Sequence, residues 1–219
     1  MYVLKGRNAY DCAYYAGKSC DAGGCKYQPS LKKKHGMECP YTRAVAAALN
    51  ASITLFNVHS LHYQSQYGAF RGQTREVLIV DEAHKLATTY MSIYCVPLRE
   101  SSIGKPIPYY SNAVGYYGFL SEVQEEAGKR IEDLLSSRSL TERQRELLQT
   151  LQELAGKITN ALDTIREKEW GVQRVDGGVD LKPLYVGAEI RRDLLSLAEY
   201  TIHMSATIID IGQYCESVS

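Results

Sequence analysis

The sequence predicts an α/β fold in which a short parallel sheet carries the functional residues. The run Val77–Val80 is apolar and mostly β-branched, as in strands buried on both faces of a parallel sheet. Apolar residues recur at steps of three and four between Leu120 and Ile165, which predicts helices. A late extended segment, Tyr200–Ser205, is expected to rejoin the sheet after those helices.

Local signals place the other elements before and after the central strand. The alanine-rich stretch Thr42–Asn50 predicts a short helix, and Ile53–Asn57 predicts a buried strand. After Leu86 the helical pattern stops, and prolines predict loop or short extended pieces, marking a boundary.

The second half of the chain predicts a helical hairpin and then a β-hairpin. Two amphipathic helices follow Ser111, and either Ser139 with Glu142 or Thr141 with Gln144 fits a capping box that starts the second one. A short connection between them favours antiparallel packing. Asp176-Gly177-Gly178 predicts the turn of a β-hairpin within Trp170–Leu184, and Glu189–Leu197 predicts a short helix.

Two carboxylates, Asp81 and Glu82, directly follow the central strand. In open α/β sheets this end of a strand faces the ligand crevice, so both are expected where a nucleotide would bind. Asp81 suits Mg²⁺, which needs few protein carboxylates, and Glu82 can orient or deprotonate an attacking water. His84 is near enough to link this site to a neighbouring strand end. A buried strand with a solvated polar end is the alternative interpretation.

The charge of the chain is balanced overall but not locally. With 25 basic and 25 acidic residues among 219, no global field favours nucleic acid. The segment Met1–Arg43 is nevertheless cationic and rich in tyrosine. Single strands stack on aromatic rings beside basic groups, so the candidate nucleic-acid contacts are Lys5, Arg7, Tyr10, Lys32, Lys33 and Lys34. Tyrosines half-buried around a small loop-rich domain are the alternative.

Four cysteines, Cys12, Cys20, Cys25 and Cys39, fall in this cationic segment. With no membrane span or signal peptide in the sequence, we expect a cytoplasmic protein (nucleoid-associated, or nuclear in a eukaryote) whose thiols are reduced and bind metal. Seven, four and thirteen residues separate successive cysteines, so at most one pair has zinc spacing. Irregular spacing favours a [4Fe–4S] cluster, which would supply folding energy. Zinc and uninvolved thiols are the alternatives.

Several motifs resemble those of one helicase family. Residues 77–84, Val-Leu-Ile-Val-Asp-Glu-Ala-His, resemble the DEAH box of superfamily 2 helicases, which is their Walker B motif. Residues 203–208, His-Met-Ser-Ala-Thr-Ile, resemble the Ser-Ala-Thr motif of the same helicases. Leu4–Cys12 and Cys39–Tyr41 are similar to the two ends of the iron–sulfur domain in the DinG/XPD family.

The resemblance implies a partial RecA-like motor domain with an inserted iron–sulfur domain and an α-helical arch. The implied segments are residues 1–41 for the iron–sulfur domain, 42–91 for part of the first motor domain, 92–185 for the arch and 186–219 for the return to the motor. It also implies that ATP and Mg²⁺ bind beside Asp81 and Glu82. His84, Ser205 and Thr207 would couple the nucleotide to the grip on DNA.

The sequence lacks parts that such a motor needs. It has no Gly-x-x-x-x-Gly-Lys-Ser/Thr loop, and the second motor domain is missing. The chain therefore resembles an internal part of an ATP-dependent DNA helicase, and we expect it to be inactive as an ATPase alone. The resemblance implies that the complete enzyme works 5′ to 3′ on DNA. The partners of this chain would be single-stranded or forked DNA and the missing motor segments, in cis or in trans. The alternatives are a non-catalytic module for single-stranded or forked nucleic acid, and a zinc-stabilised adaptor.

Overall fold

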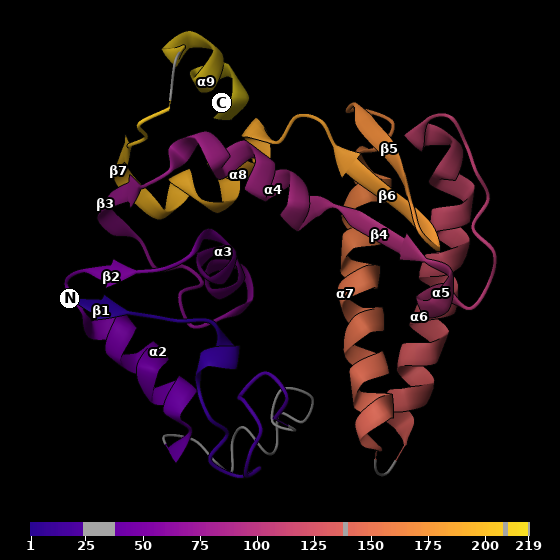
Figure 1. Ribbon diagram of the computed structural model, residues 1–219, viewed down its shortest axis with the longest axis horizontal. Helices are drawn as coiled ribbons and strands as arrows, with labels where there is room; N and C mark the ends of the chain where they lie inside the picture. Colours follow the sequence, from indigo (N-terminus) through magenta and orange to yellow (C-terminus); the bar gives the residue numbers. More distant parts are fainter. Residues whose placement is uncertain (24–37, 138–139, 208–209, 219) are drawn as a thin grey trace. The chain divides into compact units, whose positions relative to one another are not determined.

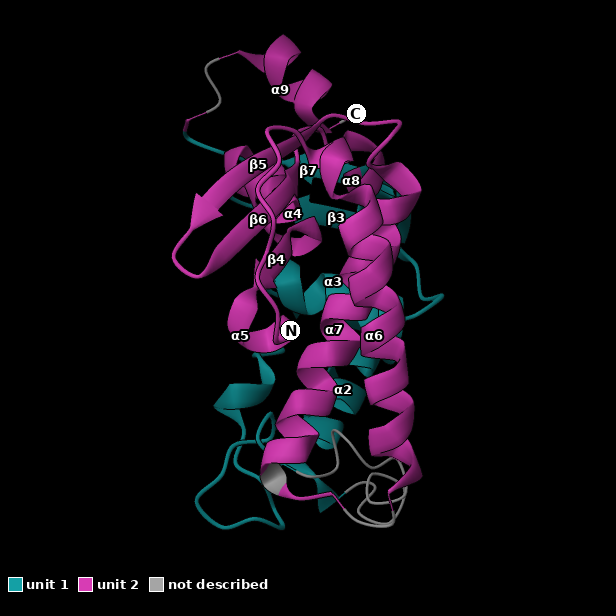
Figure 2. Ribbon diagram, turned by 90° about the vertical axis from the view of Figure 1, so that its right-hand side faces the viewer, with its two compact units in different colours: residues 1–83, 191–206 teal, residues 84–190, 207–219 magenta. Residues whose placement is uncertain are grey.

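The computed structural model describes residues 1–23, 38–137, 140–207 and 210–218, and the chain divides into two compact units. The first unit comprises residues 1–83 and 191–206, and the second comprises residues 84–190 and 207–219 (Figures 1 and 2). Helices and small sheets are mixed along the chain, which confirms the predicted α/β class. None of the helices in the described ranges is long and apolar enough to cross a membrane.

The first unit contains two parallel strand pairs. Strand β1 (Tyr2–Val3) pairs with β2 (Thr54–Leu55), and β3 (Arg75–Val80) pairs with β7 (Ala198–His203). The pairing of β3 with β7 is the predicted return of the late strand. The helices of this unit are α2 (Pro40–Asn50), α3 (Val58–Tyr67) and the short turns η1 (Arg7–Ala9) and η6 (Leu195–Leu197).

Sequence signals explain both helices of this unit. Pro40 stands at the first position of α2, where a missing N–H costs nothing, and Ala44 and Ala48 are buried with Leu4 in the core. The helix predicted over residues 42–50 is therefore confirmed. Helix α3 begins after Asn57, whose side chain accepts the Ser60 N–H at 2.7 Å, as a preferred N-cap residue does.

The expectation that the central strand is buried on both faces is wrong. Val77 is 44% exposed and Ile79 is 57% exposed, and β7 is the only strand that pairs with β3 in the described part of the chain. The predicted buried strand Ile53–Asn57 is likewise reduced to the two residues of β2, with Ile53 exposed. An apolar pattern shows that a strand is suited to burial, but burial itself requires other elements that cover both faces of the sheet. In the described part of the chain, Val77 and Ile79 are not covered in this way.

The second unit joins a helical hairpin to a three-stranded antiparallel sheet. Its helices are η4 (Ala83–Lys85), α4 (Leu86–Tyr94), α5 (Glu100–Ile103), η5 (Ala113–Tyr116), α6 (Tyr117–Ser136), α7 (Glu142–Thr164), α8 (Gly187–Asp193) and α9 (Ile211–Val218). The first residue of η4 and the last three residues of α8 belong to the first unit. Its strands are β4 (Val96–Arg99), β5 (Trp170–Val175) and β6 (Gly178–Pro183), in the order β4-β6-β5.

Both predicted hairpins are present in this unit. Strands β5 and β6 pair across a two-residue turn in which Gly177 has φ +63°, a conformation that glycine adopts without strain. Helices α6 and α7 lie side by side in both views (Figures 1 and 2), and Gln124 Nε2 donates to Thr159 Oγ1 at 2.8 Å between them. The capping box between Thr141 and Gln144 is formed.

The expectation that the helical pattern stops at Leu86 is wrong, whereas the short extended piece expected around Pro97 is present as β4. Helix α4 continues to Tyr94, and β4 then pairs with β6. Pro97 stands opposite Asp180 in β4, and an edge strand tolerates a proline because its outer side needs no N–H donor. Leu98, beside this proline, is fully buried. Pro97 therefore lies in a short extended piece, as expected, and this piece is an edge strand of the sheet.

A buried polar pair lies within the first unit. His62 Nδ1 of α3 lies 3.6 Å from Asp193 Oδ2, and the Asp193 side chain is only 1% exposed. Arg192 Nε donates to Asp193 Oδ1 at 2.7 Å. Burial lowers the pKa of His62, and the opposing effect of the Asp193 charge is smaller. The neutral imidazole is therefore the form that the folded chain favours.

We expect this pair to make the fold sensitive to acid. Because the pKa of His62 is lower in the folded chain, the unfolded chain binds more protons, and the free energy of unfolding should fall as the pH drops from above about 6.5. His62→Gln should flatten this dependence in urea titrations at neutral and mildly acidic pH. The exposed His59 serves as the control: its charge is the smallest contributor to the His62 shift, so His59→Gln should change the slope much less than His62→Gln does. An unchanged slope in His62→Gln would contradict the prediction.

Candidate functional site

The acidic end of β3 meets the end of β7. The Val80 carbonyl accepts the Met204 N–H at 2.9 Å, and the Ala83 N–H donates to the Met204 carbonyl at 3.0 Å. Asp81 and Glu82 stand between these two bonded positions, and both are exposed. Ser205 directly follows Met204, so its strand end adjoins the turn that carries the two carboxylates.

The turn at the acidic pair has a constrained backbone. Glu82 has φ +52°, in the left-handed region that side chains other than glycine rarely adopt. The Asp81 Oδ1 accepts the Glu82 N–H at 2.8 Å, which holds that conformation. Strain of this kind costs on the order of 1–3 kcal/mol and is concentrated at functional sites. The two carboxylates therefore project from a turn with a fixed geometry.

The structure assigns the five predicted residues of this site to different units. Asp81, Glu82 and Ser205 belong to the first unit, where the strand pairing brings them to one sheet end. His84, on η4, and Thr207, in the turn after β7, belong to the second unit. Exposed carboxylate oxygens beside a hydroxyl are ligands of the kind that Mg²⁺ and its waters prefer.

Three of the predicted metal-binding cysteines line one cavity of about 380 Å³, namely Cys12, Cys20 and Cys39. The Cys12 N–H donates to the Lys18 carbonyl at 2.8 Å, and the Cys20 N–H donates to the Tyr10 carbonyl at 2.7 Å. These bonds fold the chain back so that the first two thiols reach the same cavity. No group of three metal-binding side chains is already assembled among the described residues.

The fourth predicted ligand and half of the predicted nucleic-acid contacts fall in a part of the chain without described structure. Cys25, Lys32, Lys33 and Lys34 all lie outside the described residues. The geometry of the site is consequently built on Cys12, Cys20 and Cys39 together with the helix that follows the last of them.

The position of Cys39 favours the thiolate. Cys39 is the N-cap residue of α2. Burial acts to raise the pKa of its thiol, but hydrogen bonds from Thr42, the Tyr41 N–H and the Cys20 thiol outweigh burial and lower the pKa. The thiolate is the form that binds a metal, so a lowered pKa makes Cys39 more suitable as a ligand. The donor set therefore fits a thiolate-bound metal centre.

The remaining predicted contacts surround one buried ring. The Arg7 guanidinium lies 5.1 Å from the centre of the Tyr41 ring, and Tyr10 packs edge-on against that ring at 5.4 Å. The Lys5 N–H donates to the Tyr10 hydroxyl at 3.2 Å, and the Lys5 side chain is exposed. Tyr10 thus helps to pack the cysteine segment onto α2, as the alternative interpretation of the tyrosines expected.

Sequence reasoning missed the residues that support this ring. Gln64 is 3% exposed, and its Nε2 donates to the Tyr41 hydroxyl at 2.6 Å. The same side chain accepts the Ala69 N–H at 3.1 Å. Thr42, which stabilises the Cys39 thiolate, was missed as well. No local pattern marks either residue, although Thr42 stands three positions after an N-cap.

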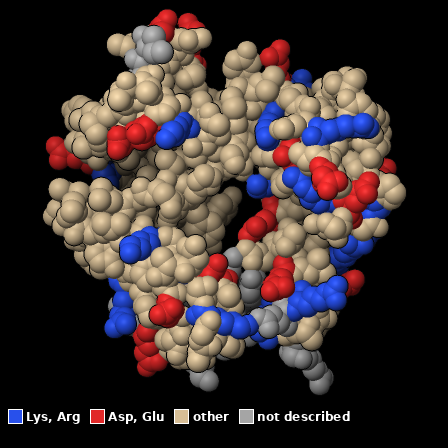
Figure 3. Space-filling view, in the orientation of Figure 1, with Lys and Arg blue, Asp and Glu red and all other residues tan. Residues whose placement is uncertain are grey.

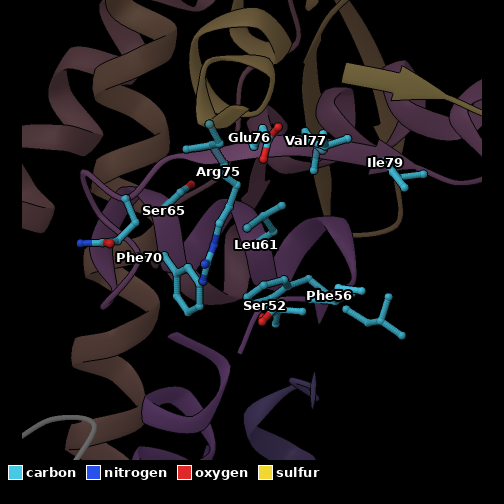
Figure 4. A pocket seen from close by; sticks show the side chains of 15 residues that line it. Ser52, Phe56, Leu61, Ser65, Phe70, Arg75, Glu76, Val77 and Ile79 are labelled. Atoms are coloured by element: carbon cyan, nitrogen blue, oxygen red, sulfur yellow. The ribbon is translucent and has the colours of Figure 1, made fainter. Parts of the chain in front are cut away.

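A second cavity of the first unit, of about 510 Å³, lies between β2 and β3. Figure 4 shows Leu61, Ser65 and Phe70 on one side and the β3 residues Arg75, Glu76, Val77 and Ile79 on the other. The Val80 carbonyl accepts the N–H of Met204, directly after β7. Successive residues of a strand direct their backbone N–H and C=O groups to opposite sides, so those of Ile79 point away from β7. The unpaired edge of β3 therefore borders this cavity.

Charge on the surface is mixed. On the face shown in Figure 3, basic and acidic side chains are interspersed, in keeping with a formal net charge of zero.

No protein-family model and no curated protein matches this chain. The function is therefore argued from the motifs and from the geometry described above.

Proposed function

We propose that this chain is part of an ATP-dependent, DEAH-box DNA helicase of the iron–sulfur DinG/XPD type. The observation that carries the proposal is the parallel pairing of β3 with β7. Met204, the residue before Ser205, bonds through its backbone to Val80 and Ala83, which flank the Asp81-Glu82 turn. Two motifs about 120 residues apart in the chain, each resembling a helicase motif, thereby meet at one sheet end.

The residues at this sheet end have distinct roles in the proposal. Asp81 would hold Mg²⁺ beside the phosphates of ATP, and Glu82 would orient or deprotonate the attacking water. Bound Mg²⁺ would supply the positive charge that stabilises the transferred phosphoryl group. Ser205 would transmit the state of this site along β7, because the backbone of Met204 bonds to residues on both sides of the acidic pair.

The cysteine cavity supports the second part of the proposal. Cys12, Cys20, Cys25 and Cys39 would hold a [4Fe–4S] cluster, with Cys39 presented as a thiolate at the start of α2. Such a centre would contribute folding energy to the glycine-rich residues before α2. Single-stranded or forked DNA is the proposed substrate.

The open sheets of the first unit support the idea that other motor segments complete them. Val77 and Ile79 are exposed although they belong to a parallel strand, a type that is ordinarily covered on both faces. The cavity beside β3 leaves room along an unpaired strand edge. The missing phosphate-binding loop and second motor domain would come from further polypeptide, in cis or in trans.

We expect the chain alone to hydrolyse ATP no faster than its Glu82→Gln variant. Without the Gly-rich loop and its lysine, half of the electrostatic clamp on the phosphates is missing, and such a clamp is worth several kcal/mol of transition-state stabilisation. The measurement is phosphate release with Mg²⁺ and ATP, with and without single-stranded DNA. Turnover of about 1 s⁻¹ or more that Glu82→Gln abolishes would contradict the expectation.

DNA binding tests the proposal from the other direction. The chain should bind single-stranded DNA without nucleotide, with an affinity that falls as salt rises. Failure to bind at low salt would contradict the proposed substrate. The second candidate function is a non-catalytic module that binds single-stranded DNA, and the missing phosphate-binding loop favours it. Such a module would bind DNA without any motor segment encoded nearby. A zinc-stabilised adaptor would be colourless.

A further inference from the structure

Two tyrosines at the rim of the cysteine cavity have exposed rings. Tyr63 is 46% exposed and Tyr67 is 75% exposed, and both line the cavity of Cys12, Cys20 and Cys39. They stand one turn apart on α3, so they share a helix face. Their ring centres are 5.8 Å apart, with the planes tilted by 50°. Together they form an aromatic platform, the Tyr63–Tyr67 pair.

The helix that carries this pair is held firmly. Gln64, between the two tyrosines, is buried and bonds both to the Tyr41 hydroxyl and to the Ala69 N–H. The Gly68 N–H donates to the Gln64 carbonyl at 3.1 Å where the helix ends. The platform is therefore fixed before any ligand binds, which reduces the entropy lost on binding.

A basic group lies near the platform. Arg7 lines the same cavity, and its buried Nε has no hydrogen-bond partner within the described ranges. The Arg7 guanidinium also lies 5.1 Å from the centre of the Tyr41 ring, which holds it at this cavity. A ligand for this site should thus combine flat rings with acceptor oxygens or negative charge.

Single-stranded nucleic acid has this combination. Its unstacked bases offer flat faces to aromatic side chains, and its phosphates offer acceptors to arginine. In a duplex the base faces are covered by their neighbours, so a platform of this kind discriminates against double strands. A protein ligand has no regular series of exposed rings with a charged backbone.

We propose that Tyr63 and Tyr67 stack the bases of a single DNA strand at the rim of the cysteine cavity, with Arg7 as a polar contact. This inference rests on the proposed function for its substrate, but it assigns the grip to residues that neither the motifs nor the cysteines include. Stacking depends on the ring and not on the hydroxyl, so phenylalanine should replace either tyrosine and leucine should not. The contact should show little sequence preference.

The test uses the whole chain purified without oxygen and a fluorescently labelled oligothymidylate, alongside the same oligomer with abasic residues. Tyr63→Leu and Tyr67→Leu should each weaken binding of the normal oligomer by roughly five-fold or more, whereas Tyr67→Phe should bind like the wild type. Tyr185, 68% exposed in the second unit, provides the control Tyr185→Leu. The abasic oligomer should bind the wild type as weakly as the normal oligomer binds the leucine variants.

Each other outcome decides against a specific statement. Equal binding of normal and abasic oligomers overturns the stacking inference, and the proposed function stands if that binding is salt-dependent and the iron content is intact. Absence of any binding by the wild type overturns the inference and the proposed substrate together. Wild-type binding of the normal oligomer by folded, iron-containing Tyr63→Leu and Tyr67→Leu overturns the assignment to these two rings. If one leucine variant loses its iron or fails to fold, the other leucine variant decides.

Discussion

Replacement of Cys39 by serine is expected to abolish the iron content of the chain and to unfold the residues before α2. A serine oxygen is a hard, weakly acidic donor and a poor substitute for a thiolate on iron. Cys39 is a proposed ligand, and hydrogen bonds from Thr42, the Tyr41 N–H and the Cys20 thiol lower the pKa of its thiol. Loss of a structural metal centre removes folding energy on the order of several kcal/mol.

The measurement is the iron and acid-labile sulfide content per chain, together with the visible absorbance during thermal unfolding. Cys215→Ser is the matched control, since Cys215 is an exposed thiol on α9 of the second unit. It should keep the iron content of the wild type. Equal iron in Cys39→Ser and Cys215→Ser would show that Cys39 is not a ligand.

The second large effect is expected in the core of the second unit. Leu181 of β6 is fully buried between β4 and β5, opposite Val96 and Val172. Leu181→Ala removes buried methyl groups and leaves a cavity, which costs about 2–5 kcal/mol of unfolding free energy. Trp170, the single tryptophan of the chain, packs in the same core cluster, so its fluorescence reports this unit.

The control for this substitution is Leu184→Ala, because Leu184 is 45% exposed one residue after β6. It should shift the tryptophan transition by less than about 1 kcal/mol. The proposed cluster would report the first unit, so its visible absorbance should be nearly the same in Leu181→Ala and the wild type. Equal effects of the two alanine variants on tryptophan fluorescence would contradict the assigned core.

Local sequence signals predicted the elements that local physics decides. The turn at Asp176-Gly177, the capping box of Thr141 and the helix after Cys39 each depend on residues within a few positions of one another. The burial of β3 was predicted wrongly because it depends on neighbouring layers, about which the strand itself carries no information. The length of α4 was not predicted, and Pro97 left loop and short strand undecided, because proline is unfavourable inside a sheet but acceptable at its edge.

The candidate site was partly predictable for the same reason. Asp81 and Glu82 could be placed at a strand end from the residues alone, and the return of Ser205 to that end followed from the order of the motifs. The support that Gln64 gives to Tyr41 bridges 23 positions of the chain, and no periodicity marks it. The exposed rings of Tyr63 and Tyr67 became visible only once α3 was placed beside the cysteine segment.

The most direct test of the account is the metal content of the unmodified chain, purified without oxygen. A [4Fe–4S] centre on Cys12, Cys20, Cys25 and Cys39 predicts about four iron and about four sulfide per chain, a brown colour and negligible zinc. About one zinc per chain with no sulfide, or no metal at all, would contradict the iron–sulfur helicase proposal.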